Sequence, residues 1–152
     1  MMHIFIAGVM QGKRLDDQID DQKYRLQITE ALRRHVPGAR ISDPWALNPG
    51  SVYFDEATAR QTFMDMTALA GTADLLIAYL PTVSMGTAME MWQAYQSGTY
   101  IVAVTPHVHQ WAIRFTADEI VPDLPSLLAM IENGSLTSRL NARQVDVPVD
   151  AE

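Results

Sequence analysis

Short apolar segments alternate along the chain with longer stretches in which apolar residues recur every three or four positions. A short apolar run between turn residues is typical of a buried parallel strand, and the longer spacing is typical of a helix with one packed face. The apolar runs predict strands at residues 3–8, 39–43, 74–80 and 100–105.

The stretches between these runs predict helices. Asp16 and Asp17 offer an N-cap for the first helix, which Pro37 and Gly38 end. Residues 44–52 read as a loop, and further helices are predicted at 53–70, 84–98 and 124–131. The residues expected to pack from the helix at 84–98 are Ala88, Met91, Trp92 and Tyr95.

Alternating strands and helices predict an α/β fold that is doubly wound and flavodoxin- or Rossmann-like. We expect a four- to five-stranded parallel sheet with helices on both faces. Residues 1–134 are expected to form this domain. The polar, acidic residues 135–152 predict a flexible C-terminal tail or an arm that reaches a partner subunit.

Composition narrows the classes of partner. The net charge of −7 argues against a nucleic-acid surface but leaves room for small anionic ligands, which need only a few local donors. No apolar run approaches the ~20 residues of a membrane span, and the N-terminus does not read as a signal peptide. With no cysteine and no metal-binding histidine spacing, we expect a cytoplasmic protein without a metal.

The segment from Ser84 to Glu90 is the most informative candidate site. In a parallel sheet, ligands bind beyond the carboxyl ends of the strands, where loops lead into helices. Ser84 can cap the helix, and Gly86 allows an anion to approach the backbone. Glu90 lies in a helical lane of small residues, as suits a nucleophile. A plain helix cap with a solvated glutamate is an equally consistent interpretation.

Other strand-to-helix segments hold weaker candidates. Gly8, Gly12 and Arg14 could hold one phosphate, although a plain loop with solvated cations is the favoured interpretation. Asp43, after the second strand, could contact a ribose or simply belong to a turn. Asp65 lies among methionines on the second long helix and is either functional or a surface aspartate.

Two of these segments together resemble the nucleoside 2-deoxyribosyltransferase superfamily. The family's marker is a strand that begins with Asp, followed by S-x-G-x-x-x-E at the head of the next helix. Here Asp74 begins the strand, and Ser84, Gly86 and Glu90 match the second part. A G-x-x-x-G-x-R arrangement from Gly8 to Arg14 is also similar. The likeness is closest to the 2'-deoxynucleoside 5'-phosphate N-hydrolase and CMP-hydrolase branch.

The resemblance implies an enzyme that cleaves the base–sugar bond without an organic cofactor. Glu90 would be the nucleophile at C1' and would form a glycosyl-enzyme ester. Ser84 and Gly86 would hold the 5'-phosphate, with Gly12 and Arg14 beside them. Asp65 would contact the sugar or the departing base, although its spacing to Asp74 is one residue longer than in the hydrolases.

Ser84 bears on the subclass, because the transferases usually carry an aspartate there. A carboxylate repels a phosphate, whereas a hydroxyl can donate to it, so Ser84 favours a nucleoside 5'-monophosphate substrate. The resemblance also implies a homodimer with a shared active site, in which the partner supplies a serine. The matching region here, residues 109–114, has no serine.

Two other functions remain alternatives. A deoxyribosyltransferase would use a second base in place of water, and a nucleotide-binding or sensing module would have no turnover.

Overall fold

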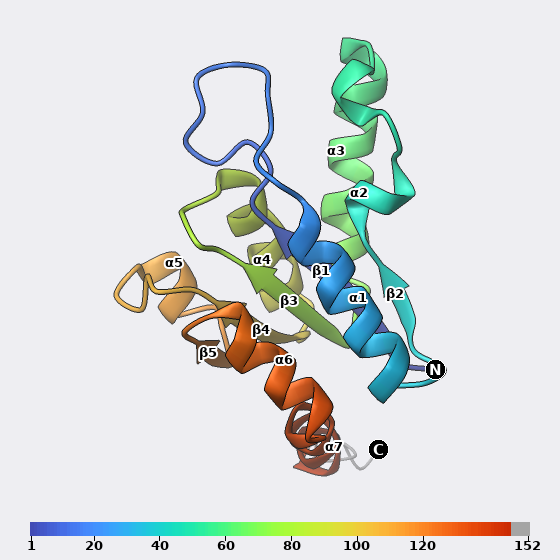
Figure 1. Cartoon of the computed structure of the whole chain (residues 1–152), viewed down its shortest axis with the longest axis vertical. Coiled ribbons are helices and arrows are strands. Elements are labelled where there is room, and N and C mark those ends of the chain that lie inside the picture. Colours follow the sequence, from blue (N-terminus) through green and yellow to red (C-terminus); the bar gives the residue numbers. More distant parts are fainter. Residues whose placement is uncertain (147–152) are drawn as a thin grey trace, which may run out of the picture.

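The computed structural model describes residues 1–146 and contains a five-stranded sheet of parallel strands in the order β2-β1-β3-β4-β5 (Figure 1). The strands are β1 (His3–Gly8), β2 (Arg40–Ser42), β3 (Leu75–Tyr79), β4 (Tyr100–Val104) and β5 (Glu119–Val121). The predicted α/β class and parallel sheet are therefore confirmed. The prediction missed β5, which is only three residues long and begins with a glutamate.

Helices cover both faces of the sheet. They are α1 (Lys23–His35), α2 (Pro44–Leu47), α3 (Glu56–Ala70), α4 (Met85–Gln96), α5 (Trp111–Arg114), α6 (Leu124–Glu132) and α7 (Ser135–Asp146), with a 3-10 turn at Ser51–Tyr53. In Figure 1, α1 and α6 lie in front of the sheet and α3 and α4 behind it. The loop predicted over residues 44–52 thus contains α2 and part of the 3-10 turn.

The strands divide their side chains between two apolar layers. In β1, Ile4 and Ile6 belong to the cluster that contains buried residues of α1, α6 and α7. Phe5 and Ala7 belong to the cluster formed with α3, α4 and α5. Because side chains alternate along a strand, a continuous apolar run such as β1 requires cover on both faces.

The first helix begins later than predicted, at Lys23 instead of directly after Asp16 and Asp17. The two aspartates accept hydrogen bonds within the loop: Asp16 accepts from the backbone N–H of Gln18, and Asp17 accepts from the side-chain amide of Gln18. Residues 9–22 therefore form a loop at the carboxyl end of β1, on the same end of the sheet as the start of α4 (Figure 1).

The packed face of α4 also differs from the prediction. Met91 is buried against the sheet as predicted, and the other buried residues of the helix are Thr87 and Ala94. Trp92 and Tyr95 are instead half exposed and stack on each other, with ring centroids 5.6 Å apart. Thr87, Met91 and Ala94 share one face at the spacing i, i+4, i+7, which leaves the two aromatic residues on another face.

The region predicted as a polar tail forms helix α7 in the part that the structure describes. Leu136 and Leu140 lie four residues apart on α7 and are buried in the cluster with α1 and α6. The two leucines dock this helix although most of its other residues are polar, so the prediction of a flexible tail is wrong for residues 135–146. Residues 147–152 lie outside the described part of the chain.

Within residues 1–146, the structure contains no helix with both the length and the apolar character that crossing a bilayer requires.

The packing of α7 can be tested by truncating Leu136, which is 1% exposed. We expect Leu136→Ala to lower the free energy of unfolding by roughly 2–4 kcal/mol, because a buried leucine is replaced by a cavity. Urea unfolding measures this loss, with Asn141→Ala on the exposed face of α7 as the control. Equal stabilities of the two variants would contradict the docked helix.

Candidate active site

The N-terminus of α4 forms one wall of the candidate site. Ser84 is its N-cap, as predicted: its Oγ accepts from the backbone N–H of Thr87 at 3.3 Å and from the Thr87 hydroxyl at 3.0 Å. Among the described residues, the N–H groups of Met85 and Gly86 have no acceptor. A helix start with free N–H groups favours an anion.

Gly86 leaves room beside these N–H groups. A Cβ atom built on Gly86 would meet only the Phe63 ring, at 3.9 Å, so the backbone here is open to a ligand. The free N–H groups of the first turn can therefore be reached by an anion at close range.

The loop after β1 forms the opposite wall. Gly12 has a φ of 57°, a conformation that side-chain-bearing residues rarely adopt, and a Cβ there would approach Val9 at 2.9 Å. Arg14 follows, and its Nε donates to Asp20 at 2.8 Å. Its Nη1 lies 3.9 Å from a carboxylate oxygen of Asp16, and the exposed guanidinium lines the site.

The start of α1 holds the end of β1 in place. Tyr24 donates its hydroxyl to the Val9 carbonyl at 3.2 Å. Arg25 donates to the carbonyls of Ile6 and Gly8, at 3.0 and 3.2 Å, and to Asp43 at 2.9 Å. These bonds fix the backbone from which the glycine loop departs.

A cavity of about 300 Å³ lies between these walls. It is lined by Gly8, Met10, Gln11, Gly12, Arg14, Arg25, Phe63, Ser84, Met85, Gly86, Thr87 and Glu90. An adjoining cavity of about 180 Å³ is mainly apolar and shares Met10, Phe63 and Glu90 with the first. Its other lining residues are Pro44, Asn48, Ser51, Phe54, Ala59, Thr62 and Met66. Glu90 therefore lies where the larger cavity, which has the more polar lining of the two, meets the mainly apolar one.

Glu90 is partly buried, whereas a carboxylate on a helix surface is usually exposed. Burial raises its pKa to about 8, and the positive charge of Arg25 acts in the opposite direction. The interpretation of Glu90 as a solvated surface residue is therefore disfavoured, because loss of water around the carboxyl is the largest influence on its pKa. A perturbed carboxyl in a cleft is a candidate functional group on physical grounds.

The structure brings six of the predicted site residues together around one cavity. They are Gly8, Gly12, Arg14, Ser84, Gly86 and Glu90. Their segments are far apart in sequence, and the parallel sheet places the ends of β1 and β3 side by side.

Asp43 and Asp65 lie elsewhere. Asp43 is buried behind the cavity, where its Oδ1 accepts from Arg25 and caps α2 through the Trp45 N–H. Asp65 is exposed and accepts from Gln61, and it lines neither cavity. The next residue of α3, Met66, lines the apolar cavity instead. This agrees with the spacing from Asp65 to Asp74, which is one residue longer than in the hydrolases that the sequence resembles.

Sequence reasoning missed Arg25 and Phe63 as lining residues. Arg25 reads as an ordinary helix cation, because nothing in its local pattern shows that its guanidinium is buried. The only signal was its position, next to Tyr24 in the packed stripe of α1. Phe63 lies on the helix predicted at residues 53–70, where an aromatic residue is usually packed, but it is 41% exposed and lines both cavities.

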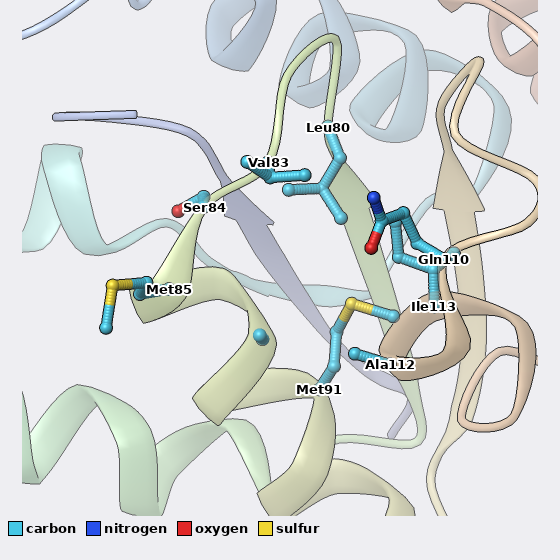
Figure 2. A pocket seen from close by; sticks show the side chains of 9 residues that line it. Leu80, Val83, Ser84, Met85, Met91, Gln110, Ala112 and Ile113 are labelled. Carbon is cyan, nitrogen blue, oxygen red and sulfur yellow. The ribbon is translucent and has the colours of Figure 1, made fainter. Parts of the chain in front are cut away.

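A separate apolar pocket of about 170 Å³ lies between α4 and α5. Figure 2 shows Leu80, Met91 and Ile113 around it, with the amide of Gln110 at its edge and the side chain of Met85 directed away. Gln110 belongs to the region 109–114 in which the resemblance places the partner's serine in related hydrolases.

Within residues 1–146, no three His, Cys, Asp or Glu side chains are grouped so that they could hold a metal ion. The reactive side chain that the cavity offers is the Glu90 carboxyl, accompanied by two arginines and helix N–H groups.

The fold and the cavity together define a doubly wound α/β domain with a carboxyl group, two arginines and free helix N–H groups at the carboxyl ends of its strands. No family model matches the sequence, and a search of curated proteins found no match.

Solved structures share the fold. A conserved protein from Enterococcus faecalis V583 is 21% identical with a TM-score of 0.59, covering 88% of this chain and 99% of that one. A 2-deoxyribosyltransferase from Bacillus psychrosaccharolyticus is 17% identical with a TM-score of 0.62, covering 85% and 95%. The CMP N-glycosidase BcmB of Clostridium botulinum is 15% identical with a TM-score of 0.49, covering 86% and 98%.

The first two similarities, with TM-scores of 0.59 and 0.62, show that the chain shares the overall fold of these proteins. At this level of identity they concern the fold, and a fold of this type carries many functions. Any activity of this chain therefore depends on the side chains in its cavity.

The raised pKa of Glu90 predicts a pH-dependent stability. A carboxyl that titrates near pH 8 in the folded state and near 4.5 when unfolded destabilises the fold progressively as pH rises between these values. We expect the stability of Glu90→Gln relative to the parent protein to increase from pH 4.5 to pH 8 and then to level off. Urea unfolding at several pH values measures this difference.

The exposed Glu30→Gln variant on α1 is the control for loss of a carboxylate. A stability difference for Glu90→Gln that does not change with pH would show that Glu90 is solvated in the folded protein.

Proposed function

We propose that this chain is an N-glycosidase that hydrolyses the base–sugar bond of a nucleoside or deoxynucleoside 5'-monophosphate. The single observation that supports it best is the position of Glu90, between a polar chamber with anion-binding groups and an apolar chamber. A nucleotide has the same sequence of parts: a phosphate, a sugar with its reactive C1' carbon, and a flat base.

The phosphate is proposed to lie at the start of α4. The free N–H groups of Met85 and Gly86, the hydroxyl of Ser84 and the Arg14 guanidinium surround this part of the cavity. Ser84 already accepts two hydrogen bonds from Thr87, so its own O–H proton is available to a phosphate oxygen. No carboxylate other than Glu90 lines this chamber among the described residues.

The base is proposed to occupy the apolar chamber. Phe54, Phe63 and Met66 offer surfaces for a planar ring, and Asn48 and Thr62 offer polar groups at its edge. With phosphate and base in these positions, the sugar lies against Glu90, which lines both chambers.

The reaction proceeds by displacement at C1'. A carboxylate oxygen of Glu90 attacks C1' while the C1'–N bond breaks, and the bonding electron pair leaves with the base, which takes a proton from water. Water then attacks C1' of the glycosyl ester, loses a proton, and releases the sugar 5'-phosphate and the Glu90 carboxylate. Two displacements retain the configuration at C1'.

A base-release assay tests the proposal and its alternatives. We expect base release from nucleoside 5'-monophosphates and little from the matching nucleosides, measured by chromatography. Exchange that requires a second free base would instead identify a deoxyribosyltransferase, and binding without either product would identify a sensing module.

Glu90→Gln is expected to lower kcat by about a thousandfold or more, because it removes the nucleophile while preserving shape. Asp65→Asn is the matched carboxylate change outside both cavities and is expected to remain active. Full activity of Glu90→Gln would exclude the proposed mechanism, and an equal loss in Asp65→Asn would return Asp65 to the site.

The protein is further proposed to act as a homodimer through α4 and α5. Large apolar side chains are exposed on these helices and beside them: Val83, Met85, Met89, Trp92, Trp111 and Phe115. Met85 is 87% exposed and Trp111 is 75% exposed, although both lie next to apolar pockets. Several large, exposed apolar side chains on neighbouring helices are typical of a protein interface.

Sedimentation analysis tests the dimer. We expect the parent protein to sediment as a dimer and Trp111→Glu as a monomer, because a charge in the interface lacks a partner. Tyr53→Glu, at an aromatic residue that is 89% exposed outside α4 and α5, is the control and should remain dimeric. A monomeric parent protein would exclude the proposed assembly.

A further inference from the structure

Arg25 is a buried cation within the cavity wall. Its side chain is 2% exposed, and it lies in the first turn of α1. Four N–H···O bonds, to Ile6, Gly8, Gln22 and Asp43, use four of its five N–H groups. The remaining N–H is on Nη2. A guanidinium is costly to remove from water, so this degree of burial requires an explanation.

The surroundings of Glu90 contain few charges. The two cavities that it lines include only Arg14 and Arg25 as other charged side chains among residues 1–146. Arg14 is exposed and paired with Asp20, so solvent screens it. Arg25 is buried, where the same charge acts through a lower dielectric.

Two further titratable groups, Asp43 and Tyr24, lie next to Arg25. Asp43 shares the Arg25 guanidinium at 2.9 Å and opposes its charge. Tyr24 is buried beside them, packs against Tyr79 with ring centroids 4.2 Å apart, and donates its hydroxyl to a backbone carbonyl. Burial raises the pKa of Tyr24 well above its usual range, so it stays neutral. The positive charge of Arg25 therefore acts on the Glu90 carboxyl, and Asp43 places a negative charge against the same guanidinium.

We infer that Arg25 is a positioning residue that stabilises the ionised form of Glu90 through the cavity wall, and that Asp43 limits this effect. The carboxylate of Glu90 must be ionised to attack C1', so the pair sets the pH at which the nucleophile is active. This catalytic consequence rests on the proposed function, whereas the electrostatic effect on Glu90 does not.

The competing explanation is that Arg25 only fastens β1 to α1 and β2. Both explanations predict that loss of Arg25 lowers stability. They differ in the shifts that they predict for the pKa of Glu90. If Arg25 acts through its charge, removing that cation should raise the pKa of Glu90, whereas removing the negative charge of Asp43 should lower it. A loosened fold would move both variants in the same direction, because added water around Glu90 favours its charged form.

The test is a carboxyl-carbon NMR titration of the full chain, with the Glu90 signal assigned by its loss in Glu90→Gln. We expect Asp43→Asn to lower the apparent pKa of Glu90 by about one pH unit or more and Arg25→Met to raise it similarly. Asparagine can still accept from the Trp45 N–H, so the cap of α2 is kept. Arg33→Met, at an exposed arginine of the same helix, should leave the titration unchanged.

Arg25→Lys keeps the charge with fewer donors and is expected to titrate closer to the parent protein than Arg25→Met. If Arg25→Met does not fold, Asp43→Asn and Arg25→Lys still decide the question. An unchanged pKa in Asp43→Asn, or shifts in the same direction for the Arg25 and Asp43 variants, would overturn the inference.

The titration needs no substrate, so it separates this inference from the proposed function. Opposite shifts without base release from any nucleotide would support the role of Arg25 and reject the N-glycosidase. In an active enzyme, kcat/KM should rise with pH as Glu90 ionises, and the pH of this rise should move with the pKa of Glu90 in each variant.

Discussion

The buried ion pair between Arg25 and Asp43 is the interaction on which the site depends. Through one guanidinium, α1 is joined to the residue that follows β2 and to two carbonyl groups of β1. Removing one member of a buried pair costs about 3–5 kcal/mol, because the other charge loses its partner. The pair therefore holds three segments in register at the point where the glycine loop leaves the sheet.

The parallel sheet then determines which groups meet. Because β1 and β3 are neighbours and run in the same direction, the loop that follows β1 and the start of α4 share one end of the sheet. The first brings Arg14 and the second brings free N–H groups, so a cation and backbone donors face one cavity. Glu90, in the second turn of α4, is carried into the same space and loses part of its contact with water.

The site was predicted best where its chemistry is local. Ser84 as a helix cap and the Gly12 turn follow from residue type and position, because a cap and a positive φ involve only neighbouring residues. Asp65 and Asp43 could not be placed in this way. Whether the Asp65 carboxylate faces a cavity or solvent depends on the rotation of α3 about its axis, which a shift of one residue changes by about 100°. The place of Asp43 depends on Arg25, which comes from a distant segment.

The sequence by itself determined the α/β alternation, four of the five strands and the junction that carries Glu90, since these depend on periodicity and turn chemistry along the chain. The tertiary structure alone decided that α7 docks through Leu136 and Leu140, that Trp92 and Tyr95 are exposed, and that Arg25 lies beneath the site. Each of these depends on what a distant segment offers as a packing surface or a hydrogen-bond partner. Such partners are brought together only when the sheet is assembled.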